Sequence, residues 1–294
     1  MGTDGGAPRI DDVARFYDDR VENVEDLNTR LAGPDRPVHH HTGIVRGDEL
    51  IPVDEAAALA WLYRCEEALT DLVWNVLQGV SPRGVRQILD AGCGEGATLA
   101  RFVELSRPQS LQCRGITLSE KQAAISQRNL SDASWFVGDM RDATCFPPGA
   151  FDAITAIEST EYLGAGGLEA FMRNVAAWLR PDGVAVMVVG SVKEGLVLDD
   201  EDQKGLEAFD EHYVTRLLST DSYRRAARKA GLVPVGELDL VPATLRYWHV
   251  RRDRPGLRNS EDGRIEDYIA RGLEAGLGDF RLFAWMRPAN ERAR

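Results

Sequence analysis

The fold is decided by the stretch Ile88-Leu89-Asp90-Ala91-Gly92-Cys93-Gly94-Glu95-Gly96, in which an apolar strand leads through three glycines into a predicted helix. Glycine allows a tight turn and a close approach of the backbone to a ligand, because it has no Cβ atom. In a doubly wound sheet, such a loop faces the crevice at the point where the strand order reverses. A glycine trio alone also fits NAD or FAD, so the neighbouring segments must identify the cofactor.

The residues that follow Arg86 alternate short apolar runs with amphipathic segments, which is typical of βαβ units on a parallel sheet. The expected strands are 87–91, 111–117, 134–137, 151–157, 184–190, 233–241 and 280–286. The expected helices between them are 97–106, 119–129, 167–179 and 221–230. We therefore predict an α/β domain with a Rossmann-like sheet of seven strands.

The residues outside this pattern are expected to cover the site. We expect residues 1–10 to be disordered. The apolar residues of 11–30 recur at roughly helical spacing, and the turn-forming residues of 33–47 predict a loop. The next helix is expected at 54–77, with Asp54 as its N-cap and Gly79 as its stop. Residues 191–220 interrupt the strand rhythm with an acidic run and a helix. We predict a helical cap and active-site loop at 1–79, the sheet domain at 80–294 and a lid at 191–220.

Composition narrows the function classes. The 294 residues carry a net charge of −12, which disfavours a nucleic-acid partner because phosphate backbones are held by accumulated Lys and Arg. No apolar window approaches about eighteen residues and the first twenty lack a signal core, so we expect a cytoplasmic protein without a membrane partner. The cysteines Cys65, Cys93, Cys113 and Cys145 show no CxxC spacing, so we expect neither a zinc site nor disulfides.

The DAGCGEG form of the glycine loop resembles the first motif of the class I S-adenosylmethionine-dependent methyltransferases, an acidic residue followed by GxGxG at the end of the first strand. The resemblance implies that Asp90 holds the methionine amino group of the cofactor. It also implies that Gly92 and Gly94 let this part of the cofactor lie against the backbone.

Two later segments agree with this resemblance. Gly115-Ile116-Thr117-Leu118-Ser119-Glu120-Lys121-Gln122 resembles the GVTLSxxQ segment of the cyclopropane synthases, although the usual acidic ribose ligand is absent. Phe136-Val137-Gly138-Asp139-Met140 fits the place where an acidic side chain accepts from the adenine amino group and its neighbour covers the ring. The resemblance implies that the further cofactor-binding residues are Thr117, Leu118, Gln122, Asp139 and Met140.

The segment 156–163 closes the fourth strand, whose carboxyl end points at the transferred methyl group in this fold. Methylation of an alkene leaves a carbocation, and a base must then remove a proton. Glu158 is the predicted base and Glu161 a weaker rival; the alternative role for Glu158 is to cap a loop or to support the cofactor indirectly. Nearby aromatic rings could stabilise the cation or simply pack in the core, namely Tyr17, Tyr162, Tyr213, Tyr247 and Trp248.

The order of several motifs resembles the bacterial prenyl diphosphate C-methyltransferases and, more distantly, the sterol C-methyltransferases. The most specific motifs are His39-His40-His41-Thr42-Gly43-Ile44 and Glu158-Ser159-Thr160. The resemblance implies deprotonation by Glu158 and a substrate diphosphate accompanied by Mg²⁺, whose protein ligands are unassigned. It also implies substrate contacts from Tyr17, Asn28, Arg30, His39, His40, Tyr213, Tyr247 and Trp248.

The chain departs from the family pattern at positions expected to line the pocket. The pattern carries an aromatic residue where Thr42 stands, two Asn where Ala156 and Ile157 stand, and Met where Glu161 stands. These departures leave isopentenyl diphosphate, geranyl diphosphate and a longer homologue as candidate substrates, within terpenoid biosynthesis.

Other interpretations remain open at this point. A small-molecule O- or N-methyltransferase has the same fold, and a silent subunit could keep the cofactor fold without activity. The three adjacent histidines suit an anion-binding loop or a solvated loop better than a metal site, because adjacent side chains rarely converge on one ion. The basic run Arg251, Arg252 and Arg254 is expected on the surface with no role. A homo-oligomer is left open.

Overall fold

The sheet that carries the site has seven strands in the computed structural model, which describes residues 7–21, 23–260 and 263–289. They are β1 Gln87–Ala91, β2 Gln112–Thr117, β3 Ser134–Val137, β4 Phe151–Ile157, β5 Leu179–Val192, β6 Val233–Asp239 and β7 Gly278–Met286. The order in the sheet is β3-β2-β1-β4-β5-β7-β6, with β7 antiparallel to both neighbours and the other pairs parallel. The order reverses between β1 and β4, so the carboxyl ends of these strands open a crevice. The predicted seven-stranded α/β fold is confirmed.

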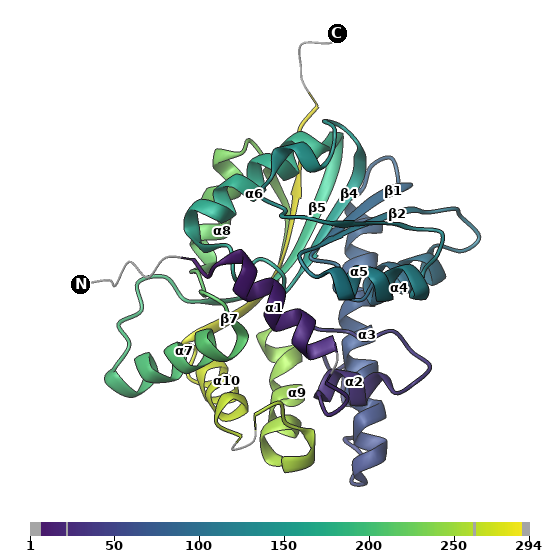
Figure 1. Cartoon of the computed structure of the whole chain (residues 1–294). Coiled ribbons are helices and arrows are strands. Elements are labelled where there is room, and N and C mark those ends of the chain that lie inside the picture. The colour runs from purple at the N-terminus through teal and green to yellow at the C-terminus, as the bar shows by residue number, and fades with distance from the viewer. Residues whose placement is uncertain (1–6, 22, 261–262, 290–294) are drawn as a thin grey trace.

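Helices cover both faces of the sheet, because successive strand residues point to opposite sides. Val186 of β5 lies in one apolar cluster with the helices α3 and α4, whereas its neighbour Met187 lies in another with α6 and α8. These helices are α3 Glu55–Val80, α4 Ala97–Ser106, α6 Gly164–Trp178 and α8 Thr220–Lys229, and α5 Glu120–Asn129 packs beside β3. Figure 1 shows this layered arrangement.

The N-terminal residues form two helices where the sequence predicted one over 11–30. They are α1 Ile10–Val21 and α2 Leu27–Ala32, and α2 begins at Asp26, whose side chain accepts the Asn28 N–H. Asp54 caps α3 as predicted, but α3 continues through Gly79 to Val80. Most of the expected disordered start at 1–10 lies outside the described residues.

The C-terminal residues contain two helices that the sequence did not predict, α9 Val241–Asp253 and α10 Arg264–Glu274. The strand expected at 233–241 ends earlier, since Asp239 accepts the Val241 N–H at 3.0 Å and Pro242 suits the first turn of α9. A third apolar cluster joins α9 and α10 to α2 and the first half of α3, and includes Trp61 and Trp248. The helical layer beneath the sheet is thus built from both ends of the chain (Figure 1).

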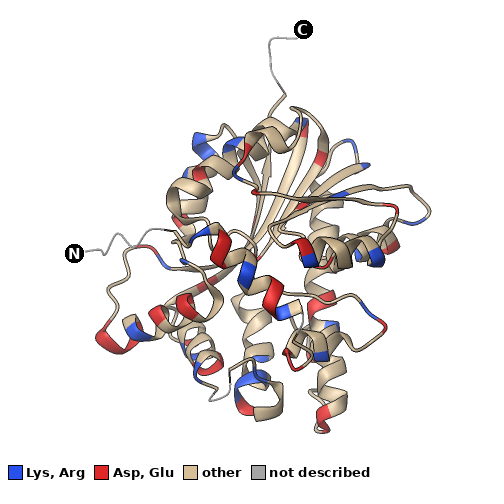
Figure 2. Ribbon diagram, in the orientation of Figure 1, with Lys and Arg blue, Asp and Glu red and all other residues tan. Residues whose placement is uncertain are grey.

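The expected lid at 191–220 contains α7 Asp200–Tyr213, which packs against α10. In Figure 2, acidic and basic residues are interspersed over the helices, and the strands carry few of either. None of the helices in the described part of the chain is long and apolar enough to span a membrane. The assignment of 191–220 as a lid, like the boundary between residues 79 and 80, stays a prediction.

Candidate active site

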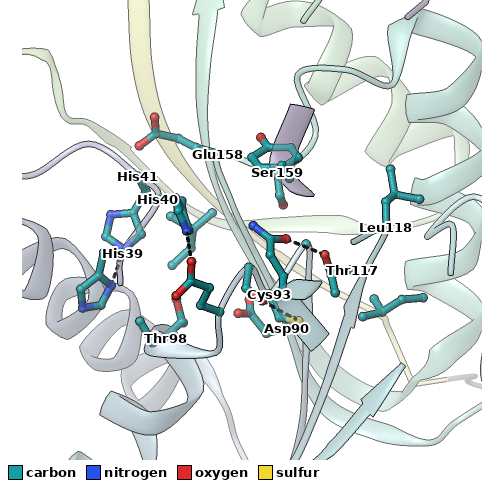
Figure 3. A pocket seen from close by; sticks show the side chains of 18 of the residues that line it. His39, His40, His41, Asp90, Cys93, Thr98, Thr117, Leu118, Glu158 and Ser159 are labelled. Atoms are coloured by element: carbon teal, nitrogen blue, oxygen red, sulfur yellow. Dashed lines mark hydrogen bonds and ion pairs between the residues drawn. The ribbon is translucent and has the colours of Figure 1, made fainter. Parts of the chain in front are cut away.

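A first cavity, of about 730 Å³, lies over the carboxyl ends of β1, β2 and β4. Figure 3 shows the three histidines on one side of this cavity, Thr117 and Leu118 on the other, and Asp90 and Cys93 between them. Its lining includes all but one of the residues predicted to bind the cofactor: Asp90, Gly92, Gly94, Thr117, Leu118, Gln122 and Met140. The structure therefore brings together three segments that are far apart in the sequence.

The glycine loop needs its glycines for two reasons. Gly92, Gly94 and Gly96 have φ angles of +79°, +51° and +82°, which side chains other than glycine rarely adopt. A Cβ atom on Gly92 would lie 2.2 Å from Cβ of Ser159. The Gly92 and Cys93 N–H groups both donate to the carbonyl of Ile116, which ties the loop to β2. The glycine loop therefore forms one wall of the first cavity.

Asp90 is a buried carboxylate at the end of β1, and Thr155 donates to it at 2.7 Å. Burial raises its pKa to about 7. An ammonium group bound in the cavity would compensate this burial, so Asp90 fits the amino group of a methionine moiety.

The wall of the first cavity that β2 and α5 form is stabilised by hydrogen bonds among its own residues. Thr117 donates to Oε1 of Gln122 at 2.8 Å, and the Gln122 N–H donates to Oγ of Ser119, which caps α5. Asp139 is the exception among the predicted cofactor residues. Its carboxylate is in a bidentate ion pair with Arg141, with a shortest distance of 2.7 Å, and it does not line the cavity, although Met140 does. Its contact with adenine stays a prediction.

A second cavity, of about 1170 Å³, adjoins the first and lies between the sheet and the helical layer. Its lining includes the predicted substrate residues Tyr17, Asn28, His40, Tyr213 and Trp248. Six of its lining side chains are aromatic: Tyr17, Phe209, Tyr213, Trp248, Tyr268 and Phe280. Such a wall suits an apolar chain, and ring faces also attract a positive charge.

Glu158 lines both cavities and is the carboxylate at their junction. It follows β4 with a φ of 44°, a conformation unusual for a residue other than glycine. Thr42 holds the carboxylate, because its N–H donates to Oε1 at 2.6 Å and its hydroxyl donates to Oε2 at 2.9 Å. Burial and the nearby Glu161 raise the pKa of Glu158 to about 8, although the hydrogen bonds from Thr42 lower it in part.

Glu161 is a second buried carboxylate and lines the second cavity. The Gly190 N–H donates to its Oε1 at 3.0 Å, and the Thr160 N–H donates to its Oε2 at 2.8 Å. Burial raises its pKa to about 7, although these N–H groups favour the charged form.

Arg251 was expected on the surface without a role, and that expectation is wrong. It is 3% exposed and lines the second cavity. Nη1 donates to the Tyr247 hydroxyl at 3.3 Å, while Nε and Nη2 have no hydrogen-bond partner among the described residues. Its nearest carboxylate, Glu266, is 3.7 Å away and already accepts the Asn259 N–H at 2.5 Å. Arg251 therefore brings a positive charge to the wall of the second cavity, and its Nε and Nη2 are buried without an acceptor among the described residues.

The histidine loop lies against both cavities. His40 lines both, and its Nε2 is 3.0 Å from Oε1 of Glu95. His39 lines the first cavity, and its Nδ1 is 3.1 Å from Nε2 of His41. Burial lowers the pKa of His41 to about 4 and lowers that of His39, so these two rings are neutral near pH 7. The loop is therefore not a cluster of three positive charges.

Two predicted substrate residues lie outside both cavity linings. Arg30 is 3.9 Å from Glu55 in a partly exposed ion pair. Tyr247 is fully buried, and its hydroxyl donates to Glu66 at 2.9 Å beside Arg251. The structure instead adds Arg20, Thr42 and Arg251 to the second cavity. Thr42 could have been identified from the sequence, because it replaces an aromatic residue in the histidine motif of the resembling family. Nothing in the sequence distinguished Arg251 from an arginine on the surface.

The chain is similar to known methyltransferases over most of its length. A family model described as a methyltransferase domain matches residues 88–183. The geranyl diphosphate 2-C-methyltransferase of Streptomyces lasalocidi is 28% identical over 89% of this chain and 86% of its own length. The 27-O-demethylrifamycin SV methyltransferase of Amycolatopsis mediterranei is 30% identical over 79% of this chain and 82% of its own length.

A solved structure is also similar over nearly the whole chain. The geranyl diphosphate C-methyltransferase of Streptomyces coelicolor A3(2), in complex with Mg²⁺, geranyl-S-thiolodiphosphate and S-adenosyl-L-homocysteine, has a TM-score of 0.79 at 26% identity. The match covers 96% of this chain and 100% of that one.

Proposed function

Since the chain belongs to the class I S-adenosylmethionine-dependent methyltransferases, the group that includes its geranyl diphosphate C-methyltransferase relatives, we propose that it methylates a double bond of a prenyl diphosphate. The observation that carries the proposal is the position of Glu158, a half-buried carboxylate in the wall that the two cavities share. A base at this junction can reach a substrate carbon next to the one that accepts the methyl group.

The first cavity fits S-adenosylmethionine. Asp90 would receive its ammonium group, and the loop at Gly92 and Gly94 leaves room for its methionine portion. Thr117, Leu118 and Met140 would border its nucleoside. When bound, S-adenosylmethionine supplies a methyl group activated by a sulfonium.

The second cavity fits a prenyl diphosphate. Arg251 would attract the diphosphate through its positive charge, assisted by Asn28 and by Arg20, which also pairs with Asp26. The aromatic wall would enclose the prenyl chain and exclude water from the cation. No group of three or more His, Cys, Asp or Glu side chains in the described residues is arranged to hold a metal ion. Mg²⁺ would therefore arrive with the diphosphate and keep several of its waters.

Glu158 would remove the proton that restores the double bond. A carboxyl group whose pKa is raised to about 8 is a stronger base than an ordinary glutamate, and it must be ionised before it can act. Loss of the proton to Oε2 would be helped by the Thr42 hydroxyl, which can turn to accept a hydrogen bond from the protonated acid.

The proposal is tested by mass spectrometry of purified protein with S-adenosylmethionine, Mg²⁺ and one prenyl diphosphate per reaction. Isopentenyl, dimethylallyl, geranyl and farnesyl diphosphate cover the chain lengths left open by the sequence. We expect a product about 14 mass units heavier in at least one reaction, the mass of an added CH₂. S-adenosylhomocysteine formation without that product, or no turnover with any of the four, would contradict the proposal.

A second candidate function is methylation of an oxygen or nitrogen atom of a small molecule, and one observation favours it. His40 contacts Glu95 through Nε2, and its Nδ1 is buried without a partner among the described residues. A histidine oriented by a carboxylate can serve as a general base toward a hydroxyl group. In that case His40→Gln would abolish turnover and Glu158→Gln would not, which is the reverse of what the first proposal requires.

A further inference from the structure

Glu161 gives the second cavity a carboxylate beyond the one that acts as base. It lies three residues after Glu158, is buried, and lines the same cavity. The deprotonation step proposed for Glu158 needs one carboxylate and does not explain a second one here. A buried carboxylate that packing alone does not require needs a separate reason, since its desolvation is costly.

Neither carboxylate has an ion-pair partner within 4.0 Å among the described residues. Burial and Glu161 raise the pKa of Glu158, and the charge of Arg251 only partly opposes this rise, while Glu161 accepts hydrogen bonds from the Gly190 and Thr160 N–H groups. Tyr17 lies near both, since its own pKa is raised by each. Two unpaired carboxylates beside aromatic ring faces complement a positive charge. The part of the second cavity beside Glu158 and Glu161 is therefore suited to a cation, whereas Arg251 in the same cavity is suited to an anion.

The hydrogen-bond donors to Glu158 and Glu161 differ, and they suit the two carboxylates to different roles. Glu161 accepts one N–H on each oxygen, from Gly190 and Thr160, and N–H groups cannot turn into acceptors. Glu158 accepts one N–H and one hydroxyl from Thr42, and the hydroxyl can turn. Glu161 thus suits a permanent anion, whereas Glu158 suits a group that gains and loses a proton.

We propose that Glu161 is a fixed anion that stabilises the carbocation of the substrate, while Glu158 takes the proton. This inference rests on the proposed function. As the methyl carbon bonds to one alkene carbon and its bond to sulfur breaks, the π electron pair enters the new C–C bond and the other alkene carbon becomes positive. A neighbouring C–H bond then gives its electron pair back to a double bond, and its proton goes to Glu158.

The test uses an analogue in which a protonated nitrogen replaces the carbon that becomes positive, on the prenyl diphosphate that the wild-type protein turns over. The neutral carbon analogue of the same shape is the control ligand. Binding of both to the protein saturated with S-adenosylhomocysteine is measured by calorimetry, with wild type, Glu161→Gln and Glu161→Met. We expect the nitrogen analogue to lose at least about tenfold in affinity in both variants, and the neutral analogue to lose much less.

Equal losses for the two analogues, or no loss for either, would overturn the inference, because a packing role for Glu161 does not distinguish charge. S-adenosylhomocysteine binding by each variant shows that the fold is intact, since Glu161 does not line the first cavity. If the wild-type protein turns over no prenyl diphosphate, the proposed function has failed. If it does so and the variants still bind the nitrogen analogue tightly, only the role of Glu161 has failed.

Discussion

At the scale of single residues, the site depends on contacts between positions that are distant in the sequence. Thr42 and Glu158 are 116 residues apart, and two hydrogen bonds join them where the cavities meet. Glu158 could be predicted because it follows a strand at the end where ligands bind. The Thr42 contact could not, because only the fold brings the histidine loop to β4.

Replacing Glu158 by Gln is expected to reduce kcat by about 10²- to 10⁴-fold, the usual contribution of a general base. Gln keeps both hydrogen bonds, since its oxygen can accept the Thr42 N–H and its NH₂ can donate to the Thr42 hydroxyl. The measurement is single-turnover product formation, with S-adenosylhomocysteine binding as the check on the fold. Glu169→Gln, which alters an exposed ion pair with Lys229, is the matched control. Wild-type activity in Glu158→Gln would remove Glu158 from the mechanism.

Replacing Arg251 by Gln is expected to lower kcat/KM for the prenyl diphosphate by roughly 10- to 150-fold, because hydrogen bonds to a charged group contribute about 1.5–3 kcal/mol. Arg251→Lys keeps the charge but not the two donors and should lose less. Arg252→Gln is the control, since Arg252 pairs with Asp253 and does not line the cavity. If Arg251→Gln changes kcat and leaves KM at its wild-type value, Arg251 does not bind the substrate.

At the scale of elements, the sheet and α3 could be predicted, whereas α9 and α10 could not. The bounds predicted for β1, β3 and β4 are confirmed to the residue, because apolar runs between turns are clear sequence signals. In α9, the buried residues Thr244, Tyr247, Trp248 and Arg251 do follow helical spacing. Two of the four are polar, so a search for apolar periodicity misses the helix and, with it, the buried arginine.

The helix α7 has to pack closely on α10 to close the second cavity. Gly205 allows this close contact because it has no side chain, and a Cβ atom there would lie 2.2 Å from the Tyr268 ring. Phe209 and Tyr213 of the same helix then line the cavity. The lid predicted at 191–220 therefore depends on one glycine.

Gly205→Ala is expected to push α7 away from α10 at a cost of about 1–3 kcal/mol, the usual penalty of overpacking. KM for the prenyl diphosphate should rise, while S-adenosylhomocysteine binding stays unchanged because α7 does not line the first cavity. Gly166→Ala in α6, where a Cβ atom meets open space, is the matched control. If both variants bind substrate like the wild type, α7 does not shape the cavity.

At the scale of the whole molecule, buried acids make stability depend on pH. Burial raises the pKa of Asp90 and Glu161 to about 7 and that of Glu158 to about 8, and it raises the pKa of Glu66 well above its ordinary value. The unfolded chain ionises these groups near pH 4, so above that pH the unfolded state binds fewer protons and the folded state is penalised. The penalty grows until the pH passes each folded pKa.

His39 and His41 have the opposite effect on the pH dependence of stability, and they exert it at lower pH. Their lowered pKa values mean that the stability they contribute is lost as pH falls below about 6.5, where the unfolded chain binds protons. At pH 6.5 the unfolded chain still binds about half a proton at each histidine, so their contribution is complete only about one pH unit higher. Between pH 6.5 and 8 the histidines therefore raise the stability slightly, and the carboxyl groups dominate its change.

The free energy of unfolding is expected to fall between pH 6.5 and 8, by up to about 1.4 kcal/mol per pH unit for each acid that still titrates. Urea unfolding at the two pH values measures the change. Glu66→Gln should flatten the dependence without touching either cavity lining, since Glu66 is buried beside Tyr247 and its Oε2 has no partner among the described residues. Asp267→Asn, on the exposed side of α10, should leave it as in the wild type. Stability that stays level or rises over this window would show that these acids are already ionised in the folded protein at pH 6.5.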